Sequence, residues 1–179
     1  MKSYVICSDI HGSITTFKKV VDFFLVNKFD KLVILGDLLY HGPRNDIPKG
    51  YNPKKVINLI NPLKDKVIMV RGNCEAEVDQ MVLNFEIYSK RSFKYGNKKI
   101  YLEHGHHLDK NCNSYKPGDI VFYGHTHVSK VEEIGGIKYI NPGSITIPKE
   151  NTKRCYGILE NNSLTIYSID DELLLDVSL

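Results

Sequence analysis

The chain has 179 residues, of which 42% are hydrophobic, and its formal net charge is +3. A chain of this length can bury one core, so we expect a single domain over residues 1–179. Acidic residues are interleaved with the lysines and arginines, which argues against a nucleic-acid-binding platform, and no apolar run approaches the roughly 20 residues that span a bilayer.

The cysteines bear on the cellular compartment. Cys7, Cys74, Cys112 and Cys155 are scattered along the chain, and none belongs to a C-x-x-C pair. Such spacing is typical of reduced thiols in a cytosolic protein, not of a disulfide scaffold. The apolar run that ends at Cys7 is too short for the core of a signal peptide. We therefore expect a soluble, cytoplasmic protein with no membrane partner.

The first third of the chain reads as strands that alternate with a helix. Apolar runs at residues 4–8 and 31–36 predict two strands. Between them, apolar side chains recur at helical spacing, namely Phe17, Val20, Val21, Phe24 and Leu25. Strand, helix and strand in this order form a βαβ unit, whose strands pair in parallel.

The next part of the chain continues this pattern. Asn52 followed by Pro53 predicts a helix N-cap with proline at the first helical position. The apolar stripe of that helix consists of Val56, Ile57 and Ile60. A further strand is predicted at residues 67–70. Residues 40–51, with two glycines and two prolines, form a loop whose length favours a functional role.

Beyond about residue 85, β-rich runs are separated by turn dipeptides. These dipeptides are Gly96-Asn97, Gly135-Gly136 and Asn161-Asn162. They favour hairpins, so we expect mostly antiparallel strands in this half. A βαβ half followed by a hairpin-rich half is consistent with an α/β fold of two packed sheets covered by helices on the outside.

Chemically active side chains gather in five short segments, each after a predicted strand. The segments are Asp9-Ile10-His11-Gly12, Gly36-Asp37, Gly72-Asn73-Cys74-Glu75, His104-Gly105-His106 and Gly124-His125-Thr126-His127. In an extended chain, residues two apart face the same way, so each Asp-x-His or His-x-His pair can point two ligands at one small volume. Carboxylate oxygens and imidazole nitrogens together suit divalent manganese, iron, nickel, cobalt or zinc.

Each segment also has an ordinary structural explanation. An Asp-x-His or His-x-His pair can be solvated at the end of a strand, and Asn73 after a glycine can be only a turn residue. These explanations do not account for five such segments in one chain, all after strands that should lie together. We therefore favour a single functional centre.

The same segments, read with their neighbours, resemble the calcineurin-like metallophosphoesterases, and within them the YfcE-type bacterial phosphodiesterases. The matching motifs cover nearly the whole chain and are Ser8-Asp9-Ile10-His11-Gly12, Leu35-Gly36-Asp37, His41-Gly42-Pro43-Arg44-Asn45, Val70-Arg71-Gly72-Asn73-Cys74, Glu77-Val78-Asp79-Gln80, His104-Gly105-His106, Tyr123-Gly124-His125-Thr126-His127 and Asn141-Pro142-Gly143-Ser144. The resemblance implies an α/β fold arranged as a four-layer α/β/β/α sandwich of two mixed sheets with helices outside. It also implies a divalent-metal-dependent phosphodiesterase.

The resemblance further implies two divalent metal ions per chain. Its pattern assigns the first ion to Asp9, His11, Asp37 and His127. It assigns the second ion to Asp37, Asn73, His104 and His125, so that Asp37 bridges the pair. Two such ions clamp the attacking and substrate oxygens, and a metal-bound hydroxide attacks the phosphorus. We expect Mn²⁺ first, with nickel, iron, cobalt or zinc as alternatives.

Three further residues are candidates for contacts with the substrate. Arg44 and Asn45, in the long loop, are candidates for binding the phosphate because guanidinium presents a planar fork to its oxygens, although an ordinary surface loop explains them equally well. Cys74 stands where many superfamily members have a histidine that acts as a general acid. A thiol is a poor substitute, so we expect substrates with good leaving groups. His41 and His106 are candidates for orienting groups beside the ligands.

The sequence leaves the natural substrate open. The first hypothesis is hydrolysis of a small or nucleotide-like phosphodiester, and the second is a non-catalytic scaffold or interaction module of the same fold. All seven ligands are present, whereas a scaffold is free to lose them, so we favour the enzyme. A nuclease would need a basic or aromatic groove that the sequence does not indicate, and a homo-oligomer remains open.

Overall fold

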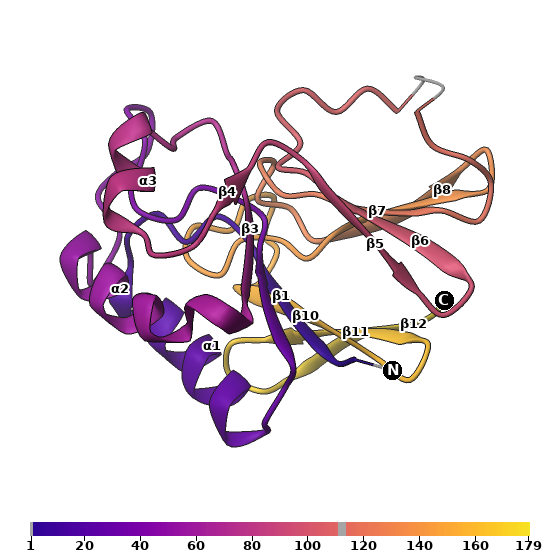
Figure 1. The fold of residues 1–179 in the computed structure, drawn as a ribbon, viewed down its shortest axis with the longest axis horizontal. Helices are drawn as coiled ribbons and strands as arrows, with labels where there is room; N and C mark the ends of the chain where they lie inside the picture. Colours follow the sequence, from indigo (N-terminus) through magenta and orange to yellow (C-terminus); the bar gives the residue numbers. More distant parts are fainter. Residues whose placement is uncertain (1, 111–113) are drawn as a thin grey trace.

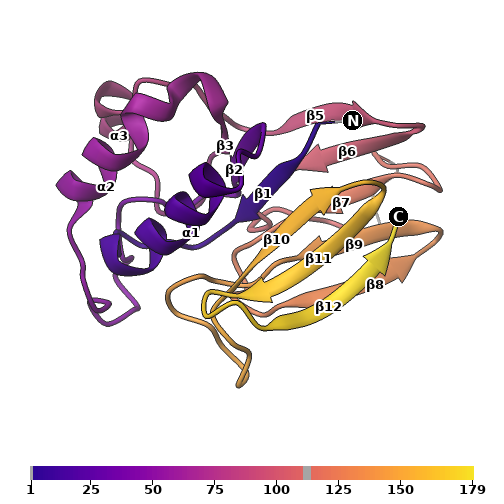
Figure 2. The same ribbon diagram turned by 90° about the horizontal axis from the view of Figure 1, so that it is seen from below.

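The computed structural model describes residues 2–110 and 114–179, so Cys112 lies outside the described part of the chain. Two β-sheets pack face to face, and the α-helices lie against the outer face of one of them (Figures 1 and 2). The strands of the larger sheet are β1 (Tyr4–Cys7), β2 (Lys31–Ile34), β3 (Val67–Val70), β4 (Ile87–Tyr88), β10 (Cys155–Glu160), β11 (Ser163–Ser168) and β12 (Leu173–Ser178). The strands of the smaller sheet are β5 (Arg91–Tyr95), β6 (Lys98–Leu102), β7 (Ile120–Phe122), β8 (Lys130–Ile134) and β9 (Ile137–Asn141).

The strand order combines parallel and antiparallel pairs in both sheets. The larger sheet runs β12-β11-β10-β1-β2-β3-β4 and the smaller one β5-β6-β7-β9-β8. Strands β1 to β4 pair in parallel, and the hairpins β5–β6, β8–β9 and β10–β11 form where they were predicted. The parallel pairs of β7 with β6 and β9 were not indicated by the turn dipeptides, because parallel partners are joined by crossovers and not by tight turns.

The helices are α1 (Ile14–Val26), α2 (Pro53–Ile60) and α3 (Glu77–Val82), and a 3-10 helix, η1 (Asn61–Lys66), follows α2. One helix, α2, begins where its capping residue predicts, and α3 was not predicted from the sequence. The Asn52 side chain accepts a hydrogen bond from the Lys55 backbone N–H at 3.0 Å, as expected of an N-cap. Leu25 departs from the prediction, because it lies at the margin of the apolar stripe of α1 and is exposed. None of the described helices is long and apolar enough to cross a membrane.

Apolar side chains fill the layers between these elements. Between the two sheets, Ile6 and Val33 pack in one cluster with Phe122. Val5 and Leu32 point to the opposite face of the larger sheet and pack with Phe17 of α1. Alternate residues along each strand therefore serve different layers, as the period of a strand requires.

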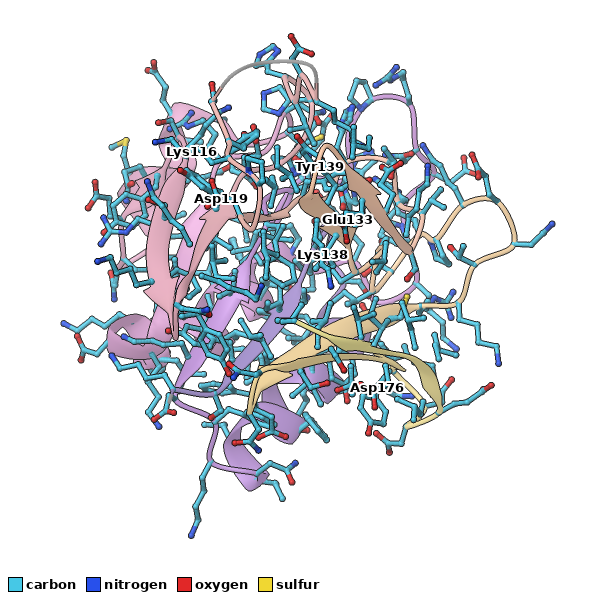
Figure 3. All side chains as sticks on the ribbon, turned by 90° about the vertical axis from the view of Figure 1, so that its right-hand side faces the viewer. Lys116, Asp119, Glu133, Lys138, Tyr139 and Asp176 are labelled. Atoms are coloured by element: carbon cyan, nitrogen blue, oxygen red, sulfur yellow. The ribbon has the colours of Figure 1, made fainter. Side chains whose placement is uncertain are left out.

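The outer face of the smaller sheet is covered differently. Tyr115 stands edge-on to Tyr101 of β6 and Tyr139 of β9, with ring centroids 4.9 and 6.1 Å away. The described part of the segment between β6 and β7 thus covers this face, whereas helices cover the larger sheet. Figure 3 shows the molecule from the right-hand side of Figure 1 and labels Glu133 of β8 and Lys138 of β9, which stand opposite each other in the strand register. The two residues have opposite charges, which favours this pairing of strands.

Candidate metal centre

The structure brings all seven predicted ligand residues to one place. Asp9 and His11 follow β1, Asp37 follows β2, Asn73 follows β3, His104 follows β6, and His125 and His127 follow β7. The loops after five strands, three from the larger sheet and two from the smaller one, therefore meet where the sheets pack together. Both halves of the chain contribute to the centre, as the carboxyl ends of neighbouring parallel strands allow.

The backbone at these residues is not extended, which corrects the prediction from sequence spacing. Strand β1 ends at Cys7 and β7 ends at Phe122, before the ligand pairs begin. Five of the seven residues have left-handed backbones, with φ of 54° at Asp9, 49° at His11, 55° at Asp37, 68° at His125 and 61° at His127. Each such residue costs about 1 kcal/mol or more, and strain of this kind gathers at functional sites. The side chains converge because the loops turn sharply, not because strands alternate.

Asp9 and two histidines form the first part of the centre. Asp9 Oδ1 lies 3.2 Å from His127 Nε2 and 3.8 Å from His11 Nε2. The two Nε2 atoms are 3.3 Å apart. Asp9 Oδ1 is buried and accepts no hydrogen bond. A buried carboxylate oxygen without a partner is costly, and a cation at this point would satisfy it.

The other ring nitrogens of three histidines show which atom faces the centre. Nδ1 of His11 lies 2.9 Å from the carbonyl of Tyr40, and Nδ1 of His127 lies 2.8 Å from that of Ile147. His104 Nδ1 lies 2.6 Å from the Leu35 carbonyl. A carbonyl only accepts, so each Nδ1 carries the proton and, in a neutral ring, each Nε2 presents a lone pair. Two lone pairs facing each other repel, unless a cation lies between them.

Asp37 joins the first part to a second one. Its Oδ2 lies 3.7 Å from His11 Nε2 and 3.4 Å from His104 Nε2. Asn73 Oδ1 lies 3.0 Å from His104 Nε2 and 2.7 Å from His125 Nδ1. Several of these donor atoms, grouped as Asp9 with His11 and His127, and Asp9 with Asp37 and His104, are close enough to hold a metal ion. The donor set of carboxylate, amide and imidazole atoms fits a divalent transition metal.

The charges of the centre are strongly coupled. Burial by itself would raise the pKa of Asp37, but the hydrogen bond and charge of His104 lower it to about 2. Burial by itself would lower the pKa of His104, but the carboxylates of Asp37 and Asp9 raise it to about 9. In the metal-free protein a proton on His104 thus balances part of the negative charge. A divalent ion would displace that proton.

Glu75 holds together the loops that follow β2 and β3, and it was not singled out as a site residue from the sequence. Its carboxylate accepts hydrogen bonds from the backbone N–H groups of Asp37 at 2.9 Å, Leu38 at 2.7 Å and Gly72. Burial and the charge of Asp37 raise the pKa of Glu75 to about 7. Its place two residues after Asn73, in the same short segment, was the only signal. Glu75 fixes the loops after β2 and β3 to each other.

Asn141 has the same role for the loop that carries His125 and His127. It is fully buried, and its Nδ2 donates to the Gly124 carbonyl at 2.8 Å and to Thr126 Oγ1 at 2.9 Å. Gly124 itself must be a glycine, since a Cβ there would lie 1.9 Å from the hydroxyl oxygen of Ser8. The motif Asn141-Pro142-Gly143-Ser144 therefore lies against the centre, where the Ser144 hydroxyl also donates to the Asp9 carbonyl at 2.7 Å.

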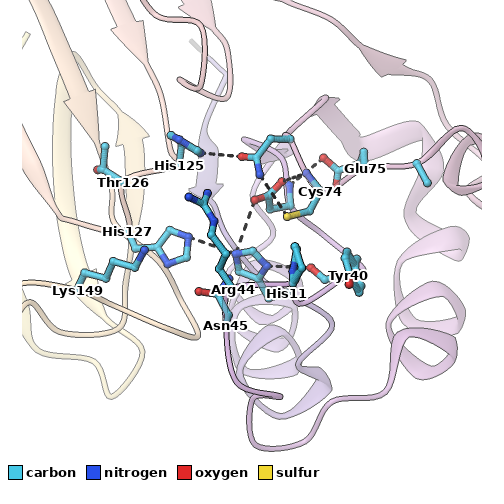
Figure 4. Close-up of a pocket in the computed structure, with 15 residues that line it drawn as sticks. His11, Tyr40, Arg44, Asn45, Cys74, Glu75, His125, Thr126, His127 and Lys149 are labelled. Atoms are coloured by element: carbon cyan, nitrogen blue, oxygen red, sulfur yellow. Dashed lines mark hydrogen bonds and ion pairs between the residues drawn. The ribbon is translucent and has the colours of Figure 1, made fainter.

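An open pocket of about 860 Å³ leads from solvent to the centre (Figure 4). Arg44, Asn45 and Cys74, the sequence's candidates for contacts with a substrate, all line it. Burial, followed by the charge of Asp37, raises the pKa of Cys74 to about 12. Tyr40 and Lys149 line the pocket as well, and neither was singled out from the sequence.

The remaining histidines lie around the centre. The ring of His106 lies 5.4 Å from that of His104 and 6.0 Å from that of His125, between centroids. His41 lies outside the pocket wall, with its ring against Tyr51, and the Nδ1 atoms of His41 and His106 are buried without hydrogen-bond partners. His106 is thus beside the ligands, as predicted, whereas His41 is further away.

Comparisons with known proteins agree with this geometry. The model of the calcineurin-like phosphoesterase superfamily domain matches residues 1–163. The chain is 40% identical to phosphodiesterase YfcE of Escherichia coli K12 over 177 residues, which cover 98% of this chain and 96% of that protein. The solved structure of the E. coli phosphoesterase YfcE superposes with a TM-score of 0.94 and covers 98% of both chains.

A more distant structure shares only the fold. Vps29 of Entamoeba histolytica, solved with zinc, is 20% identical, covers 98% of both chains and has a TM-score of 0.63. The domain match and the high identity over nearly the full length carry more weight than this likeness. On these grounds, the chain belongs to the calcineurin-like phosphoesterase superfamily.

Proposed function

We propose that the protein is a divalent-metal-dependent phosphodiesterase with two ions per chain. The single observation that carries the proposal is the buried, unpartnered Oδ1 of Asp9, which lies against the Nε2 atoms of His11 and His127. The 40% identity to a protein named phosphodiesterase YfcE supports the reaction class. Ligands from both sheets support a single domain built around one centre.

The proposal assigns a ligand set to each ion. The first set is Asp9, His11, Asp37 and His127. The second set is Asp37, Asn73, His104 and His125. The position of Asp37 Oδ2, within 4 Å of both His11 Nε2 and His104 Nε2, supports its role as the shared ligand. Asp9 and Asp37 are the only charged ligands of the set, so the ions would keep a net positive charge toward a phosphate.

Each part of the chain then has a defined task. Ions bound here would supply Lewis acidity at the phosphate and lower the pKa of a water to near neutral. The carbonyls of Tyr40, Leu35 and Ile147 hold three imidazoles so that Nε2 faces the centre. Glu75 and Asn141 hold the loops that carry the ligands. Such preorganisation keeps the donors in place without the cost of reordering them.

Arg44 and Asn45 are proposed to bind the phosphate oxygens of the substrate. Both line the pocket, and the Asn45 amide is oriented by donating to the His41 carbonyl at 2.8 Å. Arg44 is exposed, and its guanidinium has no ion pair among the described residues. A free guanidinium beside a phosphate site matches the planar, bidentate recognition that arginine favours.

The non-catalytic scaffold is the second candidate. Strained ligand loops and a buried carboxylate oxygen that points at two imidazoles are useful to a metal-dependent enzyme. A scaffold does not need either feature, so the enzyme is favoured. A cytoplasmic location belongs to the proposal and is supported by the free thiols of Cys7, Cys74 and Cys155. Manganese is the proposed ion because the donors are oxygen and nitrogen atoms.

Metal removal tests the proposed function. The protein is stripped with a chelator, reloaded with Mn²⁺, Zn²⁺ or Mg²⁺, and assayed with bis(p-nitrophenyl) phosphate while ion content and melting temperature are followed. We expect stripping to abolish turnover, manganese to restore it, and ion binding to raise the melting temperature. His107→Ala is the matched control, because His107 is exposed and adjacent but outside the ligand set. A stripped protein that hydrolyses the diester at the parental rate would refute the proposal, and a loaded protein without turnover would favour the scaffold.

A further inference from the structure

Two cations face the pocket without a carboxylate to balance them. Arg44 and Lys149 line the same pocket, and the only acidic residues in its wall are Asp37 and Glu75. Asp37 faces the imidazoles of the centre. The carboxylate of Glu75 accepts hydrogen bonds from three backbone N–H groups, so neither carboxylate pairs with the two cations. Neither cation forms an ion pair with any residue in the described part of the chain.

The two cations come from different walls of the pocket. Arg44 belongs to the loop between β2 and α2, and Lys149 belongs to the segment between β9 and β10. Figure 4 shows Lys149 beside His127 and Arg44 in front of the centre, so that the two side chains approach it from different directions. Their neighbours Asp46 and Glu150 do not line the pocket.

The backbone of Lys149 is fixed although its side chain is exposed. Its N–H donates to the His127 carbonyl at 3.1 Å, and Thr152 donates to the Lys149 carbonyl from both its N–H and its hydroxyl, at 3.0 and 2.8 Å. Glu150 and Asn151 complete this tight turn with left-handed backbones. The turn joins Lys149 directly to a residue of the centre. A charge tied to the site in this way is placed to act on a bound substrate, not on bulk solvent alone.

We propose that Lys149 binds a second anionic group of the substrate, next to the phosphate that Arg44 contacts, so that the preferred substrates are phosphodiesters that carry a further phosphate. This rests on the proposed function, because the scissile phosphate must lie at the centre. One phosphodiester has a single negative charge, which the centre and Arg44 already attract. Lys149 adds a further point charge beside His127 (Figure 4), and a dianionic phosphate monoester gains more from such a cation than a monoanionic group does.

A matched pair of substrates tests this inference. The pair is thymidine 5′-(p-nitrophenyl phosphate) and its 3′-phosphorylated counterpart, hydrolysed by the metal-loaded protein. We expect kcat/KM to be up to about fivefold higher for the 3′-phosphorylated ester at low salt, which corresponds to one exposed ion pair, and the preference to shrink as salt is added. In Lys149→Gln the ratio of the two kcat/KM values should fall toward one, whereas Lys149→Arg should keep it. Lys64→Gln, an exposed lysine of η1 outside the pocket, is the control for net charge.

Two further measurements test whether the second group must be a phosphate and whether it binds without turnover. A 3′-succinyl ester replaces the phosphate by a carboxylate, and an equal gain from it would overturn the assignment of phosphate as the second group. Calorimetric binding of thymidine 3′,5′-bisphosphate against thymidine 5′-monophosphate needs no turnover. If neither ester is hydrolysed, the proposed function fails, and tighter binding of the bisphosphate that is lost in Lys149→Gln still supports the second site. Equal kcat/KM and equal binding of the two compounds in each pair would overturn the inference while leaving a working diesterase intact.

Discussion

The two parts of the candidate centre differ in burial. Asp9, His11 and His127 are each 4% exposed or less, whereas Asn73 is exposed and His125 is half-buried. In the buried part, carbonyls fix both imidazoles. Asn73 and His125 line the open pocket together with His11 and His127, whereas Asp9 does not line it. If ions bind as proposed, we therefore expect the buried part to hold its ion more tightly than the exposed part.

The largest loss of ion content and activity is expected from a substitution of Asp37, which lies between the two parts of the centre. Asp37→Ala removes the proposed shared ligand, so we expect ion content to fall from two toward zero and kcat/KM on an activated diester to fall by about 10³-fold or more. Elemental analysis and turnover measure both. Asp22→Ala serves as the control, because Asp22 is exposed and pairs only with Lys18. A variant that kept two ions and near-parental turnover would rule out Asp37 as the bridge.

The next comparison separates the buried part from the exposed one. His11→Ala and His125→Ala should each lose about one ion per chain and about 10²-fold of activity, since each removes one proposed ligand. His11→Ala should also lower the melting temperature more, because it leaves a cavity beside the buried charges of Asp9 and Asp37. Melting curves in the presence of chelator measure the loss of melting temperature that comes from the cavity alone, without the contribution of ion binding. Equal thermal effects of the two variants would show that burial does not distinguish the two parts.

The pH dependence of stability gives a smaller effect. In the metal-free protein the pKa of His104 is raised from 6.5 to about 9, mainly through its hydrogen bond with Asp37 and the charge of Asp9, which outweigh the opposing effect of burial. A raised pKa in the folded state contributes stability that is complete below pH 6.5 and is lost as the pH rises through 9. The loss is at most about 3 kcal/mol. The low pKa of Asp37 reports the same contact and adds no second contribution.

Denaturant unfolding between pH 6 and 9 measures this effect, with and without chelator. We expect the free energy of unfolding to fall toward pH 9 in the stripped protein and to stay nearly level in the loaded one, because the ion replaces the proton on His104. His104→Asn should remove the fall from the stripped protein. If the free energy of unfolding changed with pH in the same way with and without chelator, His104 would not exchange a proton for an ion.

The sequence predicts the ligands better than it predicts how they are held. Asp9 and His127 could be found because short motifs after strands carry chemistry that their residue types reveal. Periodicity indicated α1, and capping gave the start of α2. The left-handed turns at the ligands, the carboxylate cradle of Glu75 and the approach of Lys149 could not be predicted. These features depend on contacts between loops far apart in the chain, which no local pattern of residues encodes.

The smallest effect is expected at Cys74, whose side chain lies at the boundary between the two parts. Its Sγ is near donor atoms of His11 and Asp37, its backbone N–H donates to Asp37 Oδ1 at 2.9 Å, and it lines the pocket. Since burial raises the pKa of Cys74 to about 12, the side chain is a neutral thiol at physiological pH and a poor proton donor to a leaving group. Cys74→Ala should therefore change kcat on activated diesters by less than about threefold, within the range of weak packing effects.

Cys74→His tests whether the protein lacks a general acid at this position, because an imidazole there could protonate a departing alkoxide. A positioned general acid contributes about 10² to 10⁴ in rate, and its contribution grows with the basicity of the leaving group. We expect the gain of Cys74→His to rise along a series of diesters whose leaving groups have increasing pKa, with ion content confirmed for each variant. If Cys74 is only a small residue that makes room for the substrate, histidine should instead lower every rate equally, without a change in leaving-group dependence. Loss of an ion in Cys74→Ala would point to a third role, in which the thiol itself contacts the metal, because Cys74 Sγ is close enough to the donor atoms of His11 and Asp37 to share an ion with them.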